Sequence, residues 1–199
     1  MSRRVASSFF KRHPVECARE LIGSELVCGK TSGIVVETEA YCAIGDEAAH
    51  TFVRKTARDF VEELQAGAAY VYLNYGMYWL ANVLVKGKAD GFVLIRALEP
   101  KSGIEVMKKR RGRERLRDLC SGPGKLTIAL GIDGNHHRES FTRRGAPFYF
   151  RERKTEPPVE TDRRVGISKA VDLPWRFVWK DSPFLSVKPP APLHRHKRR

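Results

Sequence analysis

The sequence predicts a mixed α+β fold, in which a single compact domain is built around a mainly antiparallel sheet and carries a protruding β-hairpin. Strand patterns outnumber helix patterns along the chain, and short turns join most of them. Antiparallel strands accept such short connections, whereas parallel strands need long crossovers. With 199 residues the chain is long enough for one substantial core and short for two.

The first half of the chain predicts one helix followed by five strands. Pro14 in the first turn and Gly23 as a stop delimit the helix. Apolar runs bounded by turn residues indicate strands at 25–28, 33–41, 70–73, 78–85 and 91–98. The turns between the paired strands fall at 29–33 and 74–77. We expect Glu99-Pro100 to stop the fifth strand.

The second half predicts two helices and four short strands. Ser102 and Glu105 fit a capping box that opens a helix, which Gly112 interrupts. A tight turn at 121–124 leads to a helix over 125–130, ended by Gly131. Strands are expected at 148–150, 165–167, 175–179 and 184–187, with a loop at 154–158. The domain is expected to span 1–188, followed by a Pro-rich and then basic tail at 189–199.

Charge and composition narrow the function. Thirty-seven Lys and Arg against 23 Asp and Glu give a net charge of +14, which indicates a polyanionic partner. The four cysteines have no zinc-ligand spacing with the histidines, so we expect reduced thiols and no metal. Residues 66–85 carry no charge over the length of a membrane span, but their four tyrosines and two asparagines favour a buried hairpin. Because no signal-peptide pattern is present, we expect a cytoplasmic protein in a bacterium or a nuclear one in a eukaryote.

Two carboxylates and an aromatic ring fall on one face of the predicted 33–41 strand. Side chains two apart in a strand point the same way, so Glu37, Glu39 and Tyr41 face one side. The opposite face carries Val36, Thr38 and Ala40. Buried, unpaired carboxylates are costly, so this pattern alone favours a solvated face with salt bridges.

Arg96 changes that interpretation. It lies in the apolar 91–98 run, on the face predicted to hold Phe92, Leu94 and Leu98. A buried guanidinium needs a carboxylate partner, and Glu37 and Glu39 are the candidates. Such a pair is expected to keep a glutamate ionised, which is the form that orients and deprotonates water.

Four tyrosines lie within nine residues at the predicted hairpin: Tyr70, Tyr72, Tyr75 and Tyr78. Asn74 and Gly76 place Tyr75 at the tip, where burial is difficult. A ring in that position is either a stray exposed side chain or a wedge of the kind that base-flipping proteins insert between base pairs. The net charge of +14 favours the wedge.

Four motifs now carry a specific resemblance. VETEAYCAIGDEAAH (36–50), YVYLNYGMYWLAN (70–82), FVLIRALEP (92–100) and LCSGPGKLTIALGI (119–132) closely resemble the alkyladenine, or 3-methyladenine, DNA glycosylase family. A weaker likeness covers most of the chain. The resemblance implies a curved, open-barrel-like sheet with peripheral helices, and a monofunctional enzyme of base excision repair that needs no cofactor. Its partner would be double-stranded DNA containing alkylated or deaminated purines, and the protein is expected to be a monomer.

The resemblance also implies roles for single residues. Glu39 matches the general base, and Arg96 helps to position its water. Four residues match the walls of the family's base pocket: Tyr41, His50, Tyr72 and Asn82. The match implies that Asn82 excludes the amino group of normal guanine. Tyr75 matches the intercalating wedge, Thr56 and Arg58 align with residues beside the wedge that contact DNA, and Lys125 lies in a turn expected to contact a phosphate.

Alternatives remain at this stage. A non-enzymatic nucleic-acid-binding domain would share the charge and the tyrosines, but Glu39 would weaken its affinity for a polyanion. An enzyme for free nucleosides would leave Tyr75 without a purpose. The basic run at 108–117 fits a solvated face and a phosphate-contacting patch equally well. Asn74 and a slightly long loop after Asn82 depart from the family pattern, which leaves the preferred lesion open.

Overall fold

The computed structural model describes residues 3–189. Its strands are β1 (Glu25–Cys28), β2 (Thr31–Cys42), β3 (Ala69–Asn74), β4 (Tyr78–Val85), β5 (Gly91–Ser102), β6 (Phe148–Arg151), β7 (Val159–Asp162) and β8 (Arg176–Trp179). Its α-helices are α1 (Pro14–Leu21), α2 (His50–Val53), α3 (Lys55–Glu63), α4 (Ile104–Arg111), α5 (Leu116–Cys120) and α6 (Pro123–Leu130). Short 3-10 turns lie at Ser7–Phe10 and Gly134–His136.

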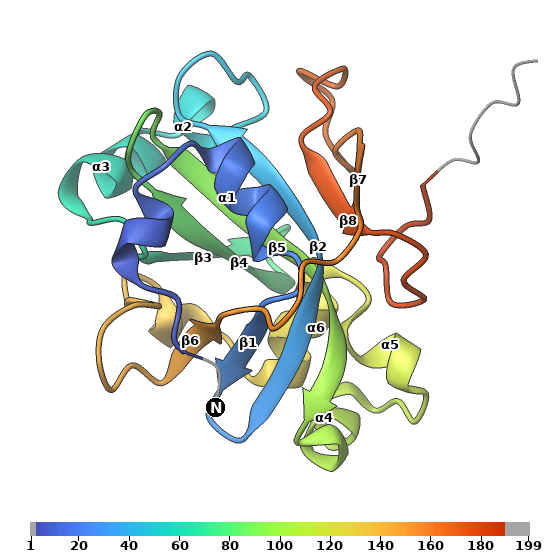
Figure 1. The fold of residues 1–199 in the computed structure, drawn as a ribbon. Helices are drawn as coiled ribbons and strands as arrows, with labels where there is room; N and C mark the ends of the chain where they lie inside the picture. Colours follow the sequence, from blue (N-terminus) through green and yellow to red (C-terminus); the bar gives the residue numbers. More distant parts are fainter. Residues whose placement is uncertain (1–2, 190–199) are drawn as a thin grey trace, which may run out of the picture.

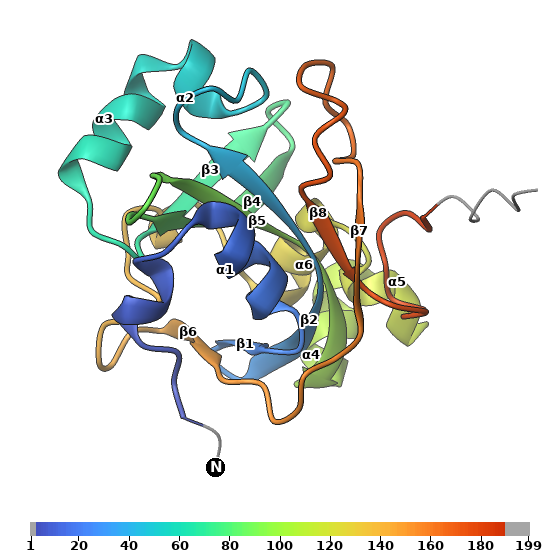
Figure 2. The ribbon, with the colours of Figure 1, turned by 45° about the horizontal axis from the view of Figure 1, so that its top comes forward.

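One curled antiparallel sheet organises the chain. Its order is β3-β4-β5-β2-β1-β6, and β8 pairs with both β2 and β7. The amino-terminal part of β2 pairs with β1 and its later part with β8, so the long strand bends between two neighbours (Figure 1). The predicted mixed α+β class with a curved, mainly antiparallel sheet is therefore confirmed. Figure 2 shows α2 and α3 together at one end and β7 and β8 at one side.

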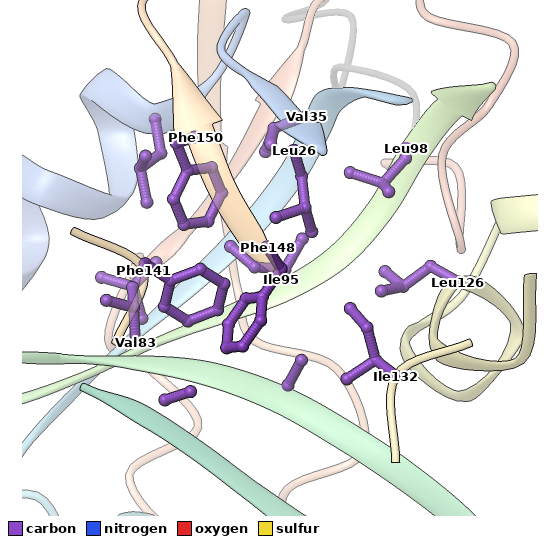
Figure 3. Close-up of a cluster of buried hydrophobic side chains, with 14 of the residues drawn as sticks. Leu26, Val35, Val83, Ile95, Leu98, Leu126, Ile132, Phe141, Phe148 and Phe150 are labelled. Atoms are coloured by element: carbon purple, nitrogen blue, oxygen red, sulfur yellow. The ribbon is translucent and has the colours of Figure 1, made fainter. Parts of the chain in front are cut away.

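The main core lies inside the curl of the sheet. Helix α1 packs on β2 and β5, and α6 packs on β4 and β5. Figure 3 shows this core, whose labelled side chains are all at most 3% exposed: Leu26, Val35, Val83, Ile95, Leu98, Leu126, Ile132, Phe141, Phe148 and Phe150. A second buried cluster, around Phe60 and Phe92, packs against the side chains of Tyr41 and Tyr72. The core thus fixes the strands from which the site residues project.

Two β-bulges break the alternation that the sequence predicted. Val35 pairs with Leu98, Glu37 with Ala97 and Thr38 with Ile95, so Val36 and Arg96 have no partner on the facing strand. An extra residue in a strand turns the following side chains to the other face. Leu98 therefore lies in the main core rather than beside Arg96, and Val36 packs in a separate small cluster with Ala97.

Several predicted boundaries were wrong. Strand β5 continues through Pro100 to Ser102, because the missing proline N–H falls where the register with β2 shifts. Helix α4 has no capping box: its N-cap is Gly103, and Glu105 pairs with Lys108 at 3.0 Å instead. Helix α6 begins at Pro123, two residues before the predicted start. Gly112 and Gly131, both left-handed, end α4 and α6 as predicted.

The segments 165–167 and 184–187 are not strands, although both were predicted as such. The N–H of Val165 donates to Glu39 at 2.7 Å, and the N–H of Ser186 donates to Glu37 at 2.6 Å. Buried carboxylates thus bind backbone groups that a sheet ladder would otherwise use. The sequence prediction also missed α2, α3 and β7.

The remaining predictions concern the uncharged run, the cysteines and the tail. Residues 66–85 form β3, the turn and β4, and no helix among residues 3–189 is long and apolar enough to cross a membrane. All four cysteines are buried and free. The predicted tail at 189–199 lies, except for its first residue, outside the described residues, so its boundary stays a prediction.

Candidate active site

A cavity of about 1150 Å³ opens beside the second buried cluster. Its walls come from β2, the 47–54 segment, the β3–β4 hairpin, β5, the start of α6 and the 165–169 segment. Four of the predicted pocket residues line it together: Tyr41, His50, Tyr72 and Asn82. We call the space beside Tyr41, His50 and Tyr72 the aromatic slot. It joins residues from three separate parts of the sequence.

Neighbouring aromatic rings fix the geometry of the slot. The ring centroids of His50 and Tyr72 lie 4.3 Å apart, and Nδ1 of His50 lies 3.1 Å from the hydroxyl of Tyr70. Tyr70 itself stacks on Phe92 with centroids 4.7 Å apart. The side-chain amide of Asn82 donates to the carbonyl of Tyr70 at 3.1 Å and is buried. The side chains that line the slot are therefore fixed by packed rings and hydrogen bonds beneath them.

The imidazole of His50 is neutral at physiological pH. Burial, with a contribution from nearby Arg54, lowers the pKa of His50 to about 4. A neutral imidazole has one N–H donor and one acceptor nitrogen. If the hydroxyl of Tyr70 donates to Nδ1, the N–H on Nε2 is left to act as a donor.

Glu39 lies behind the slot and not in its wall. Its side chain is fully buried, whereas Tyr41, Arg96 and Val165, which all hydrogen-bond to it, line the cavity. Oε2 accepts from the hydroxyl of Tyr41 at 2.7 Å and from Nη1 of Arg96 at 3.2 Å. Oε1 accepts from the N–H of Val165 at 2.7 Å. The carboxylate is therefore one side chain away from the cavity.

Glu37 is the structural partner in the cluster. Its Oε1 accepts from Nε of Arg96 at 3.1 Å, from Nε of Arg176 at 2.8 Å and from the hydroxyl of Ser186 at 2.7 Å. Both glutamates are 0% exposed, so the solvated face that the strand pattern alone favoured is wrong. The predicted pairing of Arg96 with these glutamates is confirmed, and one guanidinium bridges both.

Burial and charge oppose each other at this cluster. Burial raises the pKa of Glu39 above its ordinary value, although Arg96, the N–H of Val165 and the hydroxyl of Tyr41 act to lower it. The expectation that the arginine alone would hold this carboxylate ionised is therefore incomplete, because desolvation outweighs the ion pair. Burial and the adjacent Glu39 raise the pKa of Tyr41, so its hydroxyl stays protonated and donates.

Tyr75 occupies the tip of the β3–β4 hairpin as predicted. Tyr75 and Gly76 have φ of 51° and 68°, and the N–H of Met77 donates to the carbonyl of Asn74 at 3.0 Å. Positive φ at both central residues is typical of a type I′ turn. The Tyr75 side chain is 85% exposed and borders the same cavity as the slot.

Cationic side chains border the cavity on another side. They come from α4 and the residue pair after it, from α6 and from the 165–169 segment: Arg111, Arg113, Lys125 and Lys169. We call these four the basic rim. Part of the 108–117 run has a structural role instead, since Arg110 donates to the carbonyl of Ala129 at 3.0 Å. Contact of the other residues of that run with phosphate stays a prediction.

Thr56 and Arg58 do not join the cavity. Both lie on α3 and are exposed, and Nη1 of Arg58 donates to the carbonyl of Thr51 at 2.7 Å. Among residues 3–189, no group of three or more His, Cys, Asp or Glu side chains is arranged to hold a metal ion.

Sequence reasoning missed three participants. Arg54 lines the cavity, with its guanidinium carbon 5.9 Å from the centre of the Tyr72 ring. Arg164 lies 4.6 Å from the centre of the Tyr41 ring and pairs with buried Asp46 at 2.6 Å. Val165 contributes its backbone N–H. The apolar spacing of Ala57, Phe60 and Val61 could have revealed α3 and hence the segment carrying Arg54.

Comparison with known proteins assigns the family. The chain matches the model of the methylpurine-DNA glycosylase (MPG) family over residues 8–183. It is 46% identical over 188 residues to a protein of Agrobacterium fabrum, covering 94% of each chain. It is 48% identical over 180 residues to a protein of Rhodopseudomonas palustris, covering 89% of this chain and 85% of that one. It is 38% identical over 205 residues to a protein of Chlorobaculum tepidum, covering 99% and 97%.

All three relatives carry the name "Putative 3-methyladenine DNA glycosylase". The chain therefore belongs to the methylpurine-DNA glycosylase family. It is a DNA glycosylase, an enzyme that hydrolyses N-glycosyl bonds. The family favours this class over the non-enzymatic nucleic-acid-binding domain that the charge alone allowed.

Proposed function

We propose that this protein is a monofunctional DNA glycosylase of base excision repair, which flips alkylated or deaminated purines from double-stranded DNA and hydrolyses their bond to deoxyribose. The substrates would be of the 3-methyladenine and hypoxanthine type. The observation that carries the proposal is a buried carboxylate, Glu39, whose hydrogen-bond partners Tyr41 and Arg96 line an aromatic slot. The names of the relatives support a methylated purine as one substrate.

The aromatic slot would take the flipped base. A purine has two π faces, which match the rings of Tyr41 and His50, and Tyr72 would contact its edge. Asn82 holds its amide on the carbonyl of Tyr70 at 3.1 Å, so its position is fixed. A side chain fixed in this way can exclude the exocyclic amino group of normal guanine, because Asn82 cannot move aside to make room for it.

Glu39 would act as the general base. A carboxylate has about four lone-pair directions, and three are used by Tyr41, Arg96 and Val165. The remaining one, on Oε1, can accept from a water that attacks the anomeric carbon. Since Glu39 is fully buried, Tyr41 or the 165–169 segment must shift slightly to admit that water. Its raised pKa suits a base working near neutral pH.

The exposed residues would hold the DNA. Tyr75 would fill the space that the flipped base leaves in the stack, since an exposed ring on a tight turn is stable without contacts of its own. Lys125 and the first turn of α6 would contact a phosphate. Arg58 and Thr56, on exposed α3, would touch the backbone beyond the cavity.

Replacing Glu39→Gln tests the mechanism while keeping the size of the side chain. We expect base release from duplexes containing 3-methyladenine or hypoxanthine to fall by about 10²-fold or more, with DNA binding retained, because the general base is lost. Glu47→Gln is the matched control: this exposed carboxylate lines the same cavity and should leave release within a few-fold of normal.

Two results would contradict the proposal. Glu39→Gln protein with nearly normal release would exclude Glu39 as the base. A covalent adduct trapped by borohydride would show that a lysine is the nucleophile, and Lys125 and Lys169 lie close enough to the cavity to make that test meaningful.

A further inference from the structure

Three guanidinium groups lie in or directly behind the walls of the aromatic slot, and two of them are paired with buried carboxylates. Arg96 bridges Glu37 and Glu39. Arg164, behind Tyr41, forms a two-pronged pair with Asp46 at 2.6 and 2.8 Å, and both side chains are 0% exposed. A buried ion pair presents little net charge to a ligand beside it.

Arg54 is the third guanidinium, and nearby carboxylates are paired elsewhere. Asp59 pairs with Lys55 at 2.9 Å, and Glu47 lies 4.0 Å from Lys169. Arg54 lines the cavity with its guanidinium carbon 5.9 Å from the centre of the Tyr72 ring. Its backbone N–H donates to the carbonyl of His50 at 2.7 Å, which fixes where its side chain starts. The slot therefore has one adjacent cation without a described carboxylate partner.

We propose that Arg54 sets the charge preference of the slot, favouring neutral damaged purines over cationic ones. The inference rests on the proposed function, because it concerns which flipped base the slot accepts. A purine alkylated at a ring nitrogen carries a positive charge, whereas a deaminated purine is neutral. A fixed cation beside the base repels the first and leaves the second unaffected on binding.

The same cation acts on the reaction itself. When the N-glycosyl bond breaks, its electron pair moves onto the departing base, so a neutral base becomes anion-like and a cationic base becomes neutral. Arg54 stabilises the negative charge that develops on the neutral base. For the cationic base, the repulsion falls by the same amount as its positive charge decreases. The chemical step therefore does not discriminate by itself, and the preference established on binding carries through to the transition state.

Duplex DNA strengthens the effect. Arg54 is exposed in the free protein, where water screens its charge. DNA that covers the cavity removes water, and the lower local dielectric increases the interaction with the base. A difference of about tenfold between lesions is expected from one such charge if the base lies about as far from Arg54 as the Tyr72 ring does, which is 5.9 Å.

A charge series at Arg54 tests the inference. We would compare Arg54→Lys, Arg54→Gln and Arg54→Glu in release of hypoxanthine, which is neutral, and of 7-methylguanine, which is cationic, with limiting DNA. The ratio of neutral to cationic release should stay near normal for Lys, fall by about tenfold for Gln and fall further for Glu. Lys55→Gln, which removes an adjacent cation already paired with Asp59, should not change the ratio.

The outcomes are distinguishable. An equal fall for both lesions would show that Arg54 contacts a phosphate, and an unchanged ratio would show no role in selection; either overturns the inference. If the normal protein releases only the cationic base, Arg54→Gln must increase that release; if only the neutral one, Arg54→Gln must decrease it and Arg54→Lys must restore it. Release of neither base by the normal protein would instead overturn the proposed function.

Discussion

Several charged side chains of this protein are buried together, and burying any one of them alone would be costly. Glu37 and Glu39 are fully buried, and three arginines meet them or the adjacent ring of Tyr41. Breaking one partner of such a cluster leaves an uncompensated buried charge. The cluster is therefore a structural requirement, and its burial raises the pKa of Glu39 although Arg96 acts to lower it.

The first prediction concerns pH and belongs to Glu39. The general base must be ionised, so the rate of base release should fall as pH is lowered through the pKa of Glu39. Because burial raises that pKa, the fall should begin at a higher pH than for an ordinary glutamate, whose pKa is 4.5. Single-turnover rates measured from about pH 4 to about pH 9 would check this, with folding confirmed at each pH.

His50 provides the control. Its pKa of about 4 keeps it neutral over most of that range, so His50→Gln should lower the rate without moving the midpoint of the acid limb. A midpoint that moves with His50, or a rate that does not fall in acid, would assign the limb to another group.

The hairpin is the element in which local sequence and function agree most directly. Gly76 suits one of the two positive-φ positions of the type I′ turn, whereas Tyr75 adopts the other, with φ of 51°, despite its side chain. The strands on either side pair in register from Ala69–Val83 to Asn74–Tyr78. Gly124 at the start of α6 supports it, since an added Cβ there would lie 2.8 Å from Cβ of Tyr78. The backbone of the tip is thus held by strand pairing and by α6, although the ring of Tyr75 is exposed.

The second prediction is made at this element. Tyr75→Ser should leave thermal stability within about 0.5 kcal/mol, because an 85% exposed side chain contributes little packing. It should weaken binding to lesion-containing duplex by about tenfold, since base–aromatic stacking contributes roughly 1–3 kcal/mol. Fluorescence anisotropy with damaged and undamaged duplexes would measure it. Equal binding of Tyr75→Ser and normal protein to the damaged duplex would exclude the wedge.

Other elements show where local patterns mislead. The 165–167 and 184–187 segments have strand-like composition, yet their N–H groups are bound by Glu39 and Glu37. Nothing within either segment indicates a carboxylate more than a hundred residues away. Helix α3, in contrast, has a helical apolar spacing at Ala57, Phe60 and Val61 that is visible in the sequence.

The protein as a whole is strongly basic, and four of its cationic side chains line the mouth of the cavity. The net charge is +14, and the four side chains of the basic rim border the cavity that holds the slot. A field of this kind attracts DNA at long range but does not select a lesion. Selection has to come from the slot, which is uncharged apart from Arg54 and the neutralised pairs.

The basic rim predicts how salt affects the binding of DNA. Binding to undamaged duplex should weaken as salt increases, with a slope of log K against log salt of about −3 to −4 if the four rim cations each contact a phosphate, at about −0.9 per contact. Lys125→Gln should reduce the slope by about 0.9 and weaken binding to damaged and undamaged duplexes alike. A slope near zero would mean that the rim does not meet the DNA backbone.

Local sequence patterns were enough to predict the class of fold, the hairpin with Tyr75 at its tip, and the pairing of Arg96 with the glutamates of β2. These follow from short-range rules: the period of a strand, the φ that glycine permits, and the cost of an unpaired buried charge. Other features become visible only in the folded chain: Arg54 lines the cavity and Arg164 lies against the ring of Tyr41. The N–H groups of Val165 and Ser186 bind the carboxylates, and bulges at Val36 and Arg96 turn Leu98 away from Arg96. The reason is that such contacts join segments far apart in the chain, and an extra residue in a strand is visible only once its partner strand is in place.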